Sequence, residues 1–178
     1  MKKLFIICAI CILTGCSKTP VSKSPHEILL EIKNYSCKME ISYFSNKNTA
    51  TYIANQSYSG TGEYLMEFLD NENLKIHYKD SKLNITSKLT EKSLELFAYE
   101  EINKNPLFLS YFINTYFNSE ESSNMKASND SIEIILPNNN EYLHSAKLTF
   151  NNNQPYSLSY LDLNGNEKVN IIYSEFNF

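Results

Sequence analysis

The sequence contains no arginine and no tryptophan, and it has only four glycines among 178 residues. So few glycines leave little room for a phosphate-cradling loop, and the Gly-x-Ser-x-Gly elbow of serine hydrolases does not occur. Histidine is also scarce: His26, His77 and His144 lie far apart, and none has a neighbour at a spacing that suits zinc. We therefore expect no catalytic residue, no cofactor and no metal ion, and we expect that the protein is not an enzyme.

Positive charge is limited as well. The chain carries 16 lysines against 20 acidic residues, a net charge of −4. Residues 16–178 alone hold 14 of those lysines and all 20 acidic residues, so their net charge is −6. This balance argues against a nucleic-acid partner and against adhesion to membranes through a basic patch.

A long hydrophobic run is missing too. The stretch Leu4 to Leu13 is apolar but only about ten residues long, whereas a membrane-spanning helix needs roughly 20. Lys2 and Lys3 precede this stretch and small residues follow it, which is the pattern of an export signal. Cys8 and Cys11 lie inside the signal, and no βαβ pattern surrounds them as a thioredoxin-type Cys-x-x-Cys motif would require.

The signal ends in Leu13-Thr14-Gly15-Cys16, which resembles a bacterial lipobox. The resemblance implies that Cys16 carries diacylglycerol and becomes the mature N-terminus; the alternative is an ordinary signal with a chance cysteine. Two acyl chains suffice for stable anchoring. We expect a signal peptide over 1–15, a lipidated N-terminus and tether over 16–23 and a single domain over 24–178, anchored to the outer face of a bacterial membrane.

Cys37 is then the only other cysteine of the mature chain, so no internal disulfide is available. It falls among apolar residues of an alternating strand, which favours a buried, inert thiol over an intermolecular disulfide. His77 lies between two lysines and is interpreted as a solvated surface residue. His144 shares a face with apolar neighbours and is interpreted as a hydrogen-bonded structural residue. The acidic pair Glu120-Glu121 lies in a polar stretch and serves solvation.

Periodicity predicts an α+β fold. Ser24, Pro25 and Glu27 form a helix start with a capping box, and the helix is expected from Pro25 to about Lys33. A second helix is expected to start at Asn105-Pro106, with a wide apolar face that packs into the concave side of a sheet. Residues 118–129 are expected to form a mobile polar loop. Period-two patterns predict about nine strands: 35–43, 50–58, 64–68, 74–78, 83–85, 132–136, 142–150, 156–163 and 167–176.

Asn164-Gly165 between the last two strands is typical of a type I′ hairpin. Together these elements predict a curled antiparallel sheet, a half-barrel, wrapped over two or three helices. The aromatic side chains of Tyr52, Tyr58, Tyr64 and Phe68 are expected mainly in the core, with one or two of them lining a groove.

This order of elements resembles the LolA/LolB-like half-barrel lipoproteins, whose concave face receives a lipid or a peptide. Within them, the chain is similar to the GerS-like spore-germination lipoproteins of clostridia. The segments that carry this likeness span most of the domain: Lys47, Tyr52, Gln56, Tyr58, Tyr64 and Glu67; the run 105–117; and Pro155, Asp162, Asn164, Tyr173 and Phe176.

The resemblance implies a non-enzymatic lipoprotein of the forespore or spore envelope that is needed for germination. Such proteins bind and activate the amidase that modifies cortex peptidoglycan, so a peptidoglycan amidase is the expected partner. The alternative is a LolA/LolB-type carrier or sensor of lipids, although carriers of that family secure their lid with an arginine that this chain lacks. Exposed sheet edges would also permit a homodimer.

Overall fold

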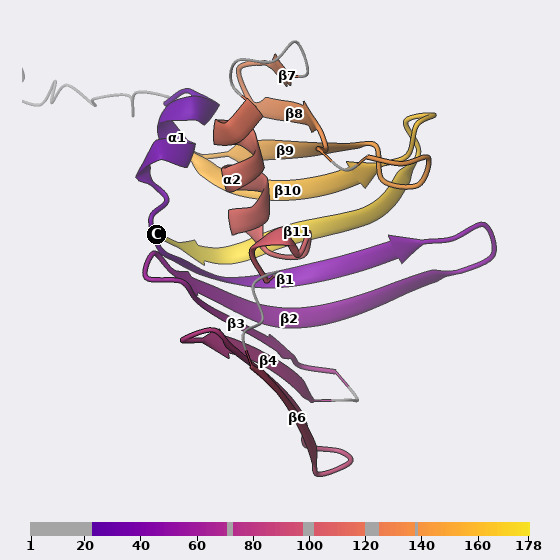
Figure 1. Ribbon diagram of the computed structural model, residues 1–178. Helices are drawn as coiled ribbons and strands as arrows, with labels where there is room; N and C mark the ends of the chain where they lie inside the picture. The colour runs from indigo at the N-terminus through magenta and orange to yellow at the C-terminus, as the bar shows by residue number, and fades with distance from the viewer. Residues whose placement is uncertain (1–22, 71–72, 98–101, 120–124, 138) are drawn as a thin grey trace, which may run out of the picture.

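The computed structural model describes residues 23–70, 73–97, 102–119, 125–137 and 139–178 (Figure 1). The expected signal peptide, Cys16, most of the expected tether and the pair Glu120-Glu121 lie outside these residues. The described residues form one curved sheet with two α-helices on its concave side. No helix in this part of the chain is long and apolar enough to span a bilayer.

The sheet has eleven strands in the order β6-β5-β4-β3-β2-β1-β11-β10-β9-β8-β7, and all neighbours are antiparallel. The first and last strands, β1 and β11, therefore pair in the middle of the sheet, and β6 and β7 form its two edges. The strand bounds are β1 Tyr35–Phe44, β2 Thr49–Ser59, β3 Glu63–Phe68, β4 Leu74–Lys79, β5 Lys82–Ser87, β6 Lys92–Phe97, β7 Met125–Ala127, β8 Ser131–Ile135, β9 Ser145–Asn151, β10 Gln154–Leu161 and β11 Glu167–Asn177.

The expected open antiparallel sheet over helices is confirmed, but the strand number of nine is wrong. The two additional strands are the edges. In β6 all six residues are exposed, so the hydrophobic contrast that marks a half-buried strand is weak. The second, β7, has only three residues and lies within the stretch expected to be a mobile loop; its pairing with β8 corrects that expectation. The strand expected from Tyr142 begins at Ser145.

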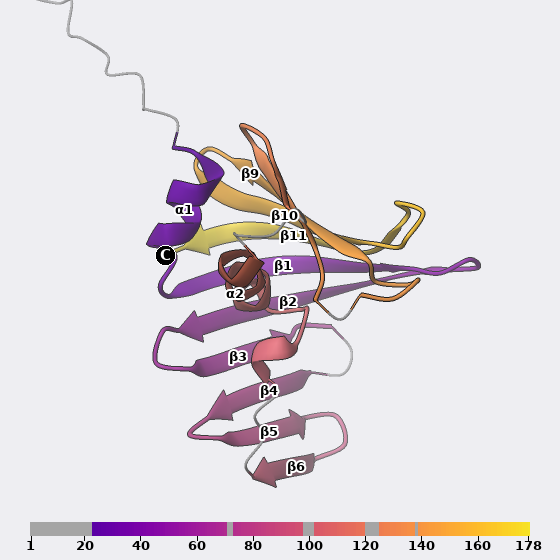
Figure 2. The same cartoon turned by 45° about the horizontal axis from the view of Figure 1, so that its top comes forward.

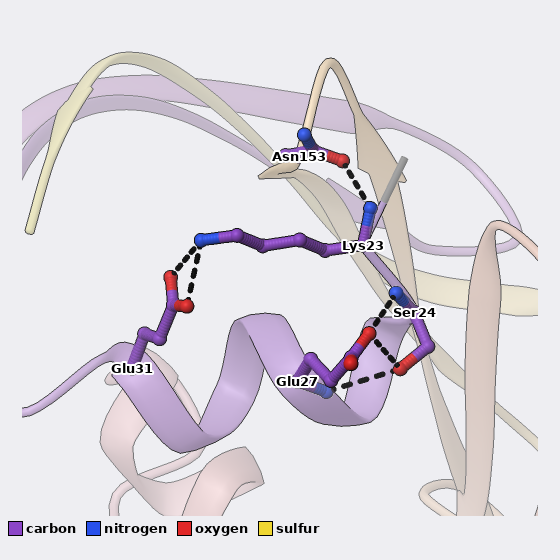
Figure 3. Close-up of polar contacts among 5 residues, drawn as sticks. All are labelled: Lys23, Ser24, Glu27, Glu31 and Asn153. Carbon is purple, nitrogen blue, oxygen red and sulfur yellow. Dashed lines mark hydrogen bonds and ion pairs between the residues drawn. The ribbon is translucent and has the colours of Figure 1, made fainter. Parts of the chain in front are cut away.

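The first helix, α1 (Pro25–Glu31), begins as the sequence predicts. The Ser24 hydroxyl accepts a hydrogen bond from the Glu27 amide, and the Glu27 carboxylate accepts one from the Ser24 amide at 2.7 Å (Figure 3). These two bonds satisfy amide groups that have no partner at a helix N-terminus. The hydrogen bond from the Ser24 amide to the carboxylate is the main reason that the pKa of Glu27 is lowered. Ile28 and Leu29 face the core.

The second helix, α2 (Leu109–Ser119), begins three residues later than expected, after a 3₁₀ turn, η1 (Ile102–Lys104). The physical reason is competition for backbone groups. The carbonyl of Pro106 accepts a hydrogen bond from the Tyr160 hydroxyl at 2.6 Å, and that of Leu107 accepts one from Gln56 Nε2 at 2.9 Å. The amides of Leu109 and Ser110 bond in turn to Gln56 Oε1 and the Tyr35 hydroxyl. Sheet side chains thus occupy amides that a helix starting at Pro106 would use, and the regular helix begins only at Leu109.

The two arms of the sheet differ in whether helices cover their concave face. We call β1 and β8–β11 the covered arm, because α1 and α2 lie over its concave face, and β4–β6 the open arm, because it extends away from both helices (Figure 2). Inward side chains of the covered arm are almost fully buried: Met39, Ile41, Ile132, Ile134, Ala146, Leu148, Leu158, Tyr160 and Ile171. The helices contribute Ile28, Leu29, Leu109 and Phe112 to this core, and Phe108, just before α2, also lies in it.

Candidate binding face

A buried polar cluster attaches the start of α2 to the sheet. Gln56 on β2 is 2 % exposed, and its Oε1 accepts hydrogen bonds from the Tyr35 hydroxyl at 2.7 Å and from the Leu109 amide at 3.3 Å. The Tyr35 hydroxyl also accepts a bond from the Ser110 amide at 3.4 Å. Side chains of the sheet thus cap amides at the N-terminus of α2, which otherwise lack partners inside the helix.

Burial keeps the tyrosines of this cluster neutral. The pKa of Tyr35 is raised well above its usual range because the ring lies in the core, and burial raises the pKa of Tyr160 in the same way. A neutral hydroxyl remains a donor, so these hydrogen bonds hold at any physiological pH. The cluster is a positioning device for α2: it fixes the helix over the covered arm and leaves the open arm without one.

An aromatic groove opens beside the helices. It has a volume of about 690 Å³ and is lined by Tyr43, Ala50, Thr51, Tyr52, Phe68, Asp70 and Leu74. The Tyr52 ring meets those of Tyr43 and Phe68 edge to face, with centroids 5.8 Å and 6.3 Å apart. As expected, two of the four aromatic residues named from the sequence, Tyr52 and Phe68, line a groove. Tyr64 is buried, with its ring against that of Phe108.

The open arm continues this groove with aliphatic side chains. Strand register places Ile85 opposite both Ile76 and Leu94, and Leu83 opposite Leu96, all on the concave face. Leu94 is 52 % exposed and Leu96 38 % exposed. Contiguous exposed apolar surface of this kind marks sites of protein or ligand contact. The groove and the concave side of the open arm together are the candidate binding face.

The candidate residues named from the sequence are dispersed. Cys37 is buried and free on β1, as expected, and burial raises the pKa of its thiol to about 12.

The three histidines lie apart. His26 contacts Tyr116, with Nδ1 2.8 Å from the hydroxyl. His77 is half-buried on the convex face, where it pairs with Glu63 at 2.8 Å. His144 lies at the other end of the sheet, beside Ser145 and Asp162. Among the described residues, no three metal-binding side chains converge.

The hairpin between β10 and β11 turns at Asn164-Gly165 as the sequence predicts, but the expected type I′ turn is wrong, because that turn needs a positive φ at both central residues and Asn164 is not among the described residues with a positive φ. Asp162 accepts hydrogen bonds from the amides of Asn164 at 2.9 Å and Asn166 at 2.8 Å, and its other oxygen pairs with Lys168 at 3.0 Å. Bonds from Asn166 are the main reason that the pKa of Asp162 lies well below its usual range. Gly165 takes a positive φ of 80° in this turn. Asp162 and Asn164 therefore shape the fold.

Sequence reasoning missed two features of the site. The first is Gln56: its place on the apolar face of an alternating strand is the signal that could have identified it, because a buried amide requires partners. The second is the pair Leu94 and Leu96, which was missed because their strand, β6, was not predicted. Leu94 and Leu96 alternate with polar residues, and that pattern is the available signal.

The family comparison covers the whole chain. The model of the family described as Sporulation protein YdcC-like matches residues 1–178. No curated protein matches the chain significantly.

Solved structures share the fold at low identity. A chain in the structure of the CwlD amidase from Clostridioides difficile in complex with the GerS lipoprotein is 24 % identical, with a TM-score of 0.53 over 86 % of this chain and 91 % of that one. An uncharacterized conserved protein from Thermus thermophilus gives 10 % identity and 0.55 over 85 % of each chain. The Pseudomonas aeruginosa MucA/MucB complex gives 11 % and 0.51, over 85 % of this chain and 55 % of the other.

These likenesses show a common fold of a curved sheet over helices, and the family match spans residues 1–22 as well as the described residues. The chain belongs to the YdcC-like family of sporulation proteins.

Proposed function

We propose that this chain is a non-enzymatic lipoprotein of the spore envelope that binds and activates a cortex peptidoglycan amidase, and that it is thereby needed for germination. Membership of a family of sporulation proteins supports a role in the spore envelope. We infer an amidase partner because this chain shares its fold with a chain of the complex between the CwlD amidase and the GerS lipoprotein. It agrees with the resemblance to GerS-like proteins in the sequence.

The anchor in this proposal is a lipid on Cys16. The lipobox resemblance and the signal pattern before it support this assignment, and the protein would then sit on the outer face of the forespore membrane. Cys16→Ala should release the protein from membranes and leave its fold intact. Unchanged membrane fractionation of that variant would exclude the lipid anchor.

The partner in this proposal docks on the candidate binding face. Interface cores are rich in aromatic and large apolar residues and poor in charge, and this face combines Tyr43, Tyr52 and Phe68 with Leu94 and Leu96. The corresponding side chains of the covered arm are already packed against α1 and α2. Pairing of the β6 edge with a second copy of the chain stays a further prediction.

The decisive experiment is affinity purification of the full chain from sporulating cells, with proteins and extractable lipids both identified by mass spectrometry. Recovery of a peptidoglycan amidase in near-equal amount, and a rise in its activity when the two purified proteins are mixed, is the expected result. Recovery of bound lipid without any protein partner would refute the proposal.

That second result would favour a LolA/LolB-type lipid carrier or sensor. The aromatic groove is the observation that speaks for this alternative, because apolar walls with few polar groups suit an acyl chain. A permanent anchor and the absence of arginine speak against a carrier that moves between membranes.

A further inference from the structure

The chain enters the domain at a fixed point. The Lys23 amide donates a hydrogen bond to Asn153 Oδ1 at 3.0 Å, and Lys23 Nζ contacts both carboxylate oxygens of Glu31, at 2.6 and 2.5 Å (Figure 3). Asn153 lies in the turn between β9 and β10, and Glu31 is the last residue of α1. We call Lys23, Glu31 and Asn153 the entry clamp. It ties the chain to a helix and to a hairpin immediately before the capping box.

Two turns of the sheet lie beside this entry point. One shallow pocket is lined by Lys23 together with Asn129 and Asp130 of the β7–β8 turn and Asn152 and Asn153 of the β9–β10 turn. Because Lys23 is paired with Glu31, Asp130 is the one charged side chain of the two turns, and the asparagine side chains are neutral donors and acceptors. This end of an otherwise acidic domain therefore presents a single negative charge and several neutral polar groups to a phospholipid headgroup layer.

The tether is short compared with the sheet. Only residues 17–22 separate Cys16 from Lys23, and a fully extended chain of that length reaches about 25 Å. From β9 to β6 the sheet order contains eight strand spacings, or about 38 Å along the curve at about 4.8 Å each. A lipid on Cys16 thus lies within about 25 Å of Lys23 and the adjoining β9–β10 turn, a distance shorter than the sheet measured along its curve.

We propose that the β7–β8 and β9–β10 turns form a membrane-facing end that rests on lipid headgroups, and that the short tether and the entry clamp hold the open arm away from the bilayer. This inference rests on the lipid anchor of the proposed function. It adds a second contact surface, for a lipid layer, and an orientation in which the candidate binding face is presented to a partner in the space beyond the membrane.

Fluorescence quenching at two positions tests the orientation. The full chain, matured in cells and reconstituted in phosphatidylcholine–phosphatidylglycerol vesicles, is labelled at Asn129→Cys beside the entry point or at Leu89→Cys in the β5–β6 turn. Both positions are exposed, and the buried Cys37 reacts slowly. A headgroup-attached quencher should act at least about threefold more strongly on residue 129, because residue 89 lies at the opposite end of the strand order from the entry point.

Matched variants separate the clamp from the tether. Asn153→Gly with Glu31→Gln should reduce the contrast at least twofold, whereas Asn152→Gly, in the same turn but outside the clamp, should preserve it. Asn152 and Asn153 both have a positive φ, so glycine fits either position. Insertion of a long Gly-Ser segment between Lys18 and Thr19 should abolish the contrast while the protein still floats with vesicles.

The results distinguish three failures. Equal quenching at both positions in protein that floats with vesicles overturns the orientation and leaves the anchor and the amidase partner intact. A contrast that survives loss of the clamp overturns the role of the clamp. Failure to float overturns the lipid anchor, and the orientation falls with it, while amidase binding by the purified protein is measured separately.

Discussion

The covered arm and the open arm are built from the same alternating strands but differ in what lies on their concave faces. Ile41 on β1 and Ile171 on β11 are fully buried, whereas Leu94 on β6 is more than half exposed. Burial of an aliphatic side chain contributes about 1.5–3 kcal/mol to folding. The covered arm therefore contributes most of the stability. On the open arm Leu83 is buried, whereas the exposed Leu94 and Leu96 of β6 contribute little to stability and remain available for contact with another molecule.

The sharpest test of this contrast is truncation in the core of the covered arm. Phe112 of α2 is fully buried, so Phe112→Ala should lower the free energy of unfolding by about 3–5 kcal/mol through lost contacts and a cavity. Leu94→Ala on the open arm should change it by less than about 0.5 kcal/mol. Urea titrations of the two variants make the comparison, and similar losses in both would contradict the division of the sheet.

A smaller effect is expected at the polar cluster beneath α2. Gln56→Ala leaves the Tyr35 hydroxyl, the Leu107 carbonyl and the Leu109 amide without this partner, and we expect a loss of about 1–3 kcal/mol. Amide exchange at Leu109 should accelerate as the start of α2 loosens. Asn55→Ala, the neighbouring exposed position on the opposite face, is the control and should change neither quantity.

Alkaline pH should destabilise the covered arm through Cys37. The thiol has a pKa of about 12 in the folded protein and 9.0 as its ordinary value, so the stabilisation is complete below pH 9 and is lost as the pH rises toward 12. Within that window each pH unit costs about 1.4 kcal/mol. In unfolding measured at several pH values, Cys37→Ala should remove the part of this slope that lies between pH 9 and pH 10, because the buried tyrosines, whose ordinary pKa is 10.0, add a slope of their own above it. An unchanged slope would show that the thiol is accessible to water.

The least effect on stability is expected on the open arm, where the effect on binding should be greatest. Leu94→Lys should leave the free energy of unfolding within about 0.5 kcal/mol of the parent. It should weaken binding of the purified amidase at least about tenfold, the effect of losing about 1.4 kcal/mol from an interface core. Phe97→Lys is the matched control, because Phe97 is 67 % exposed on the same strand but faces the convex side. Equal loss in both variants would place the contact elsewhere.

Much of the fold follows from local pattern. Alternation of apolar and polar residues identified nine of the eleven strands, and the capping box located the start of α1, because both signals depend on neighbours in sequence. The start of α2 could not be predicted from the local sequence. It depends on hydrogen bonds from Gln56 and Tyr160, which lie about 50 residues away on either side, and no local pattern reports on such partners.

The candidate binding face was predictable only in part. Aromatic spacing indicated that one or two of Tyr52, Tyr58, Tyr64 and Phe68 line a groove, but which of them do so depends on where α2 ends its cover of the sheet. The edge strand β6 was not predicted, because the alternation of Leu94 and Leu96 with polar residues covers only two apolar positions before Phe97 breaks it.

The pairing of β1 with β11 has a consequence for the timing of folding. These strands meet across a long separation, as in the hydrogen bond from Ser174 Oγ to the Lys38 carbonyl, which joins residues 136 positions apart. Closing so large a loop costs conformational entropy before any stabilising contact forms, and proteins with such topologies fold slowly. The two halves of the sheet cannot join until β11 has been synthesised. We therefore expect the pairing of β1 with β11 to form late in folding, after the local hairpins on either side of it.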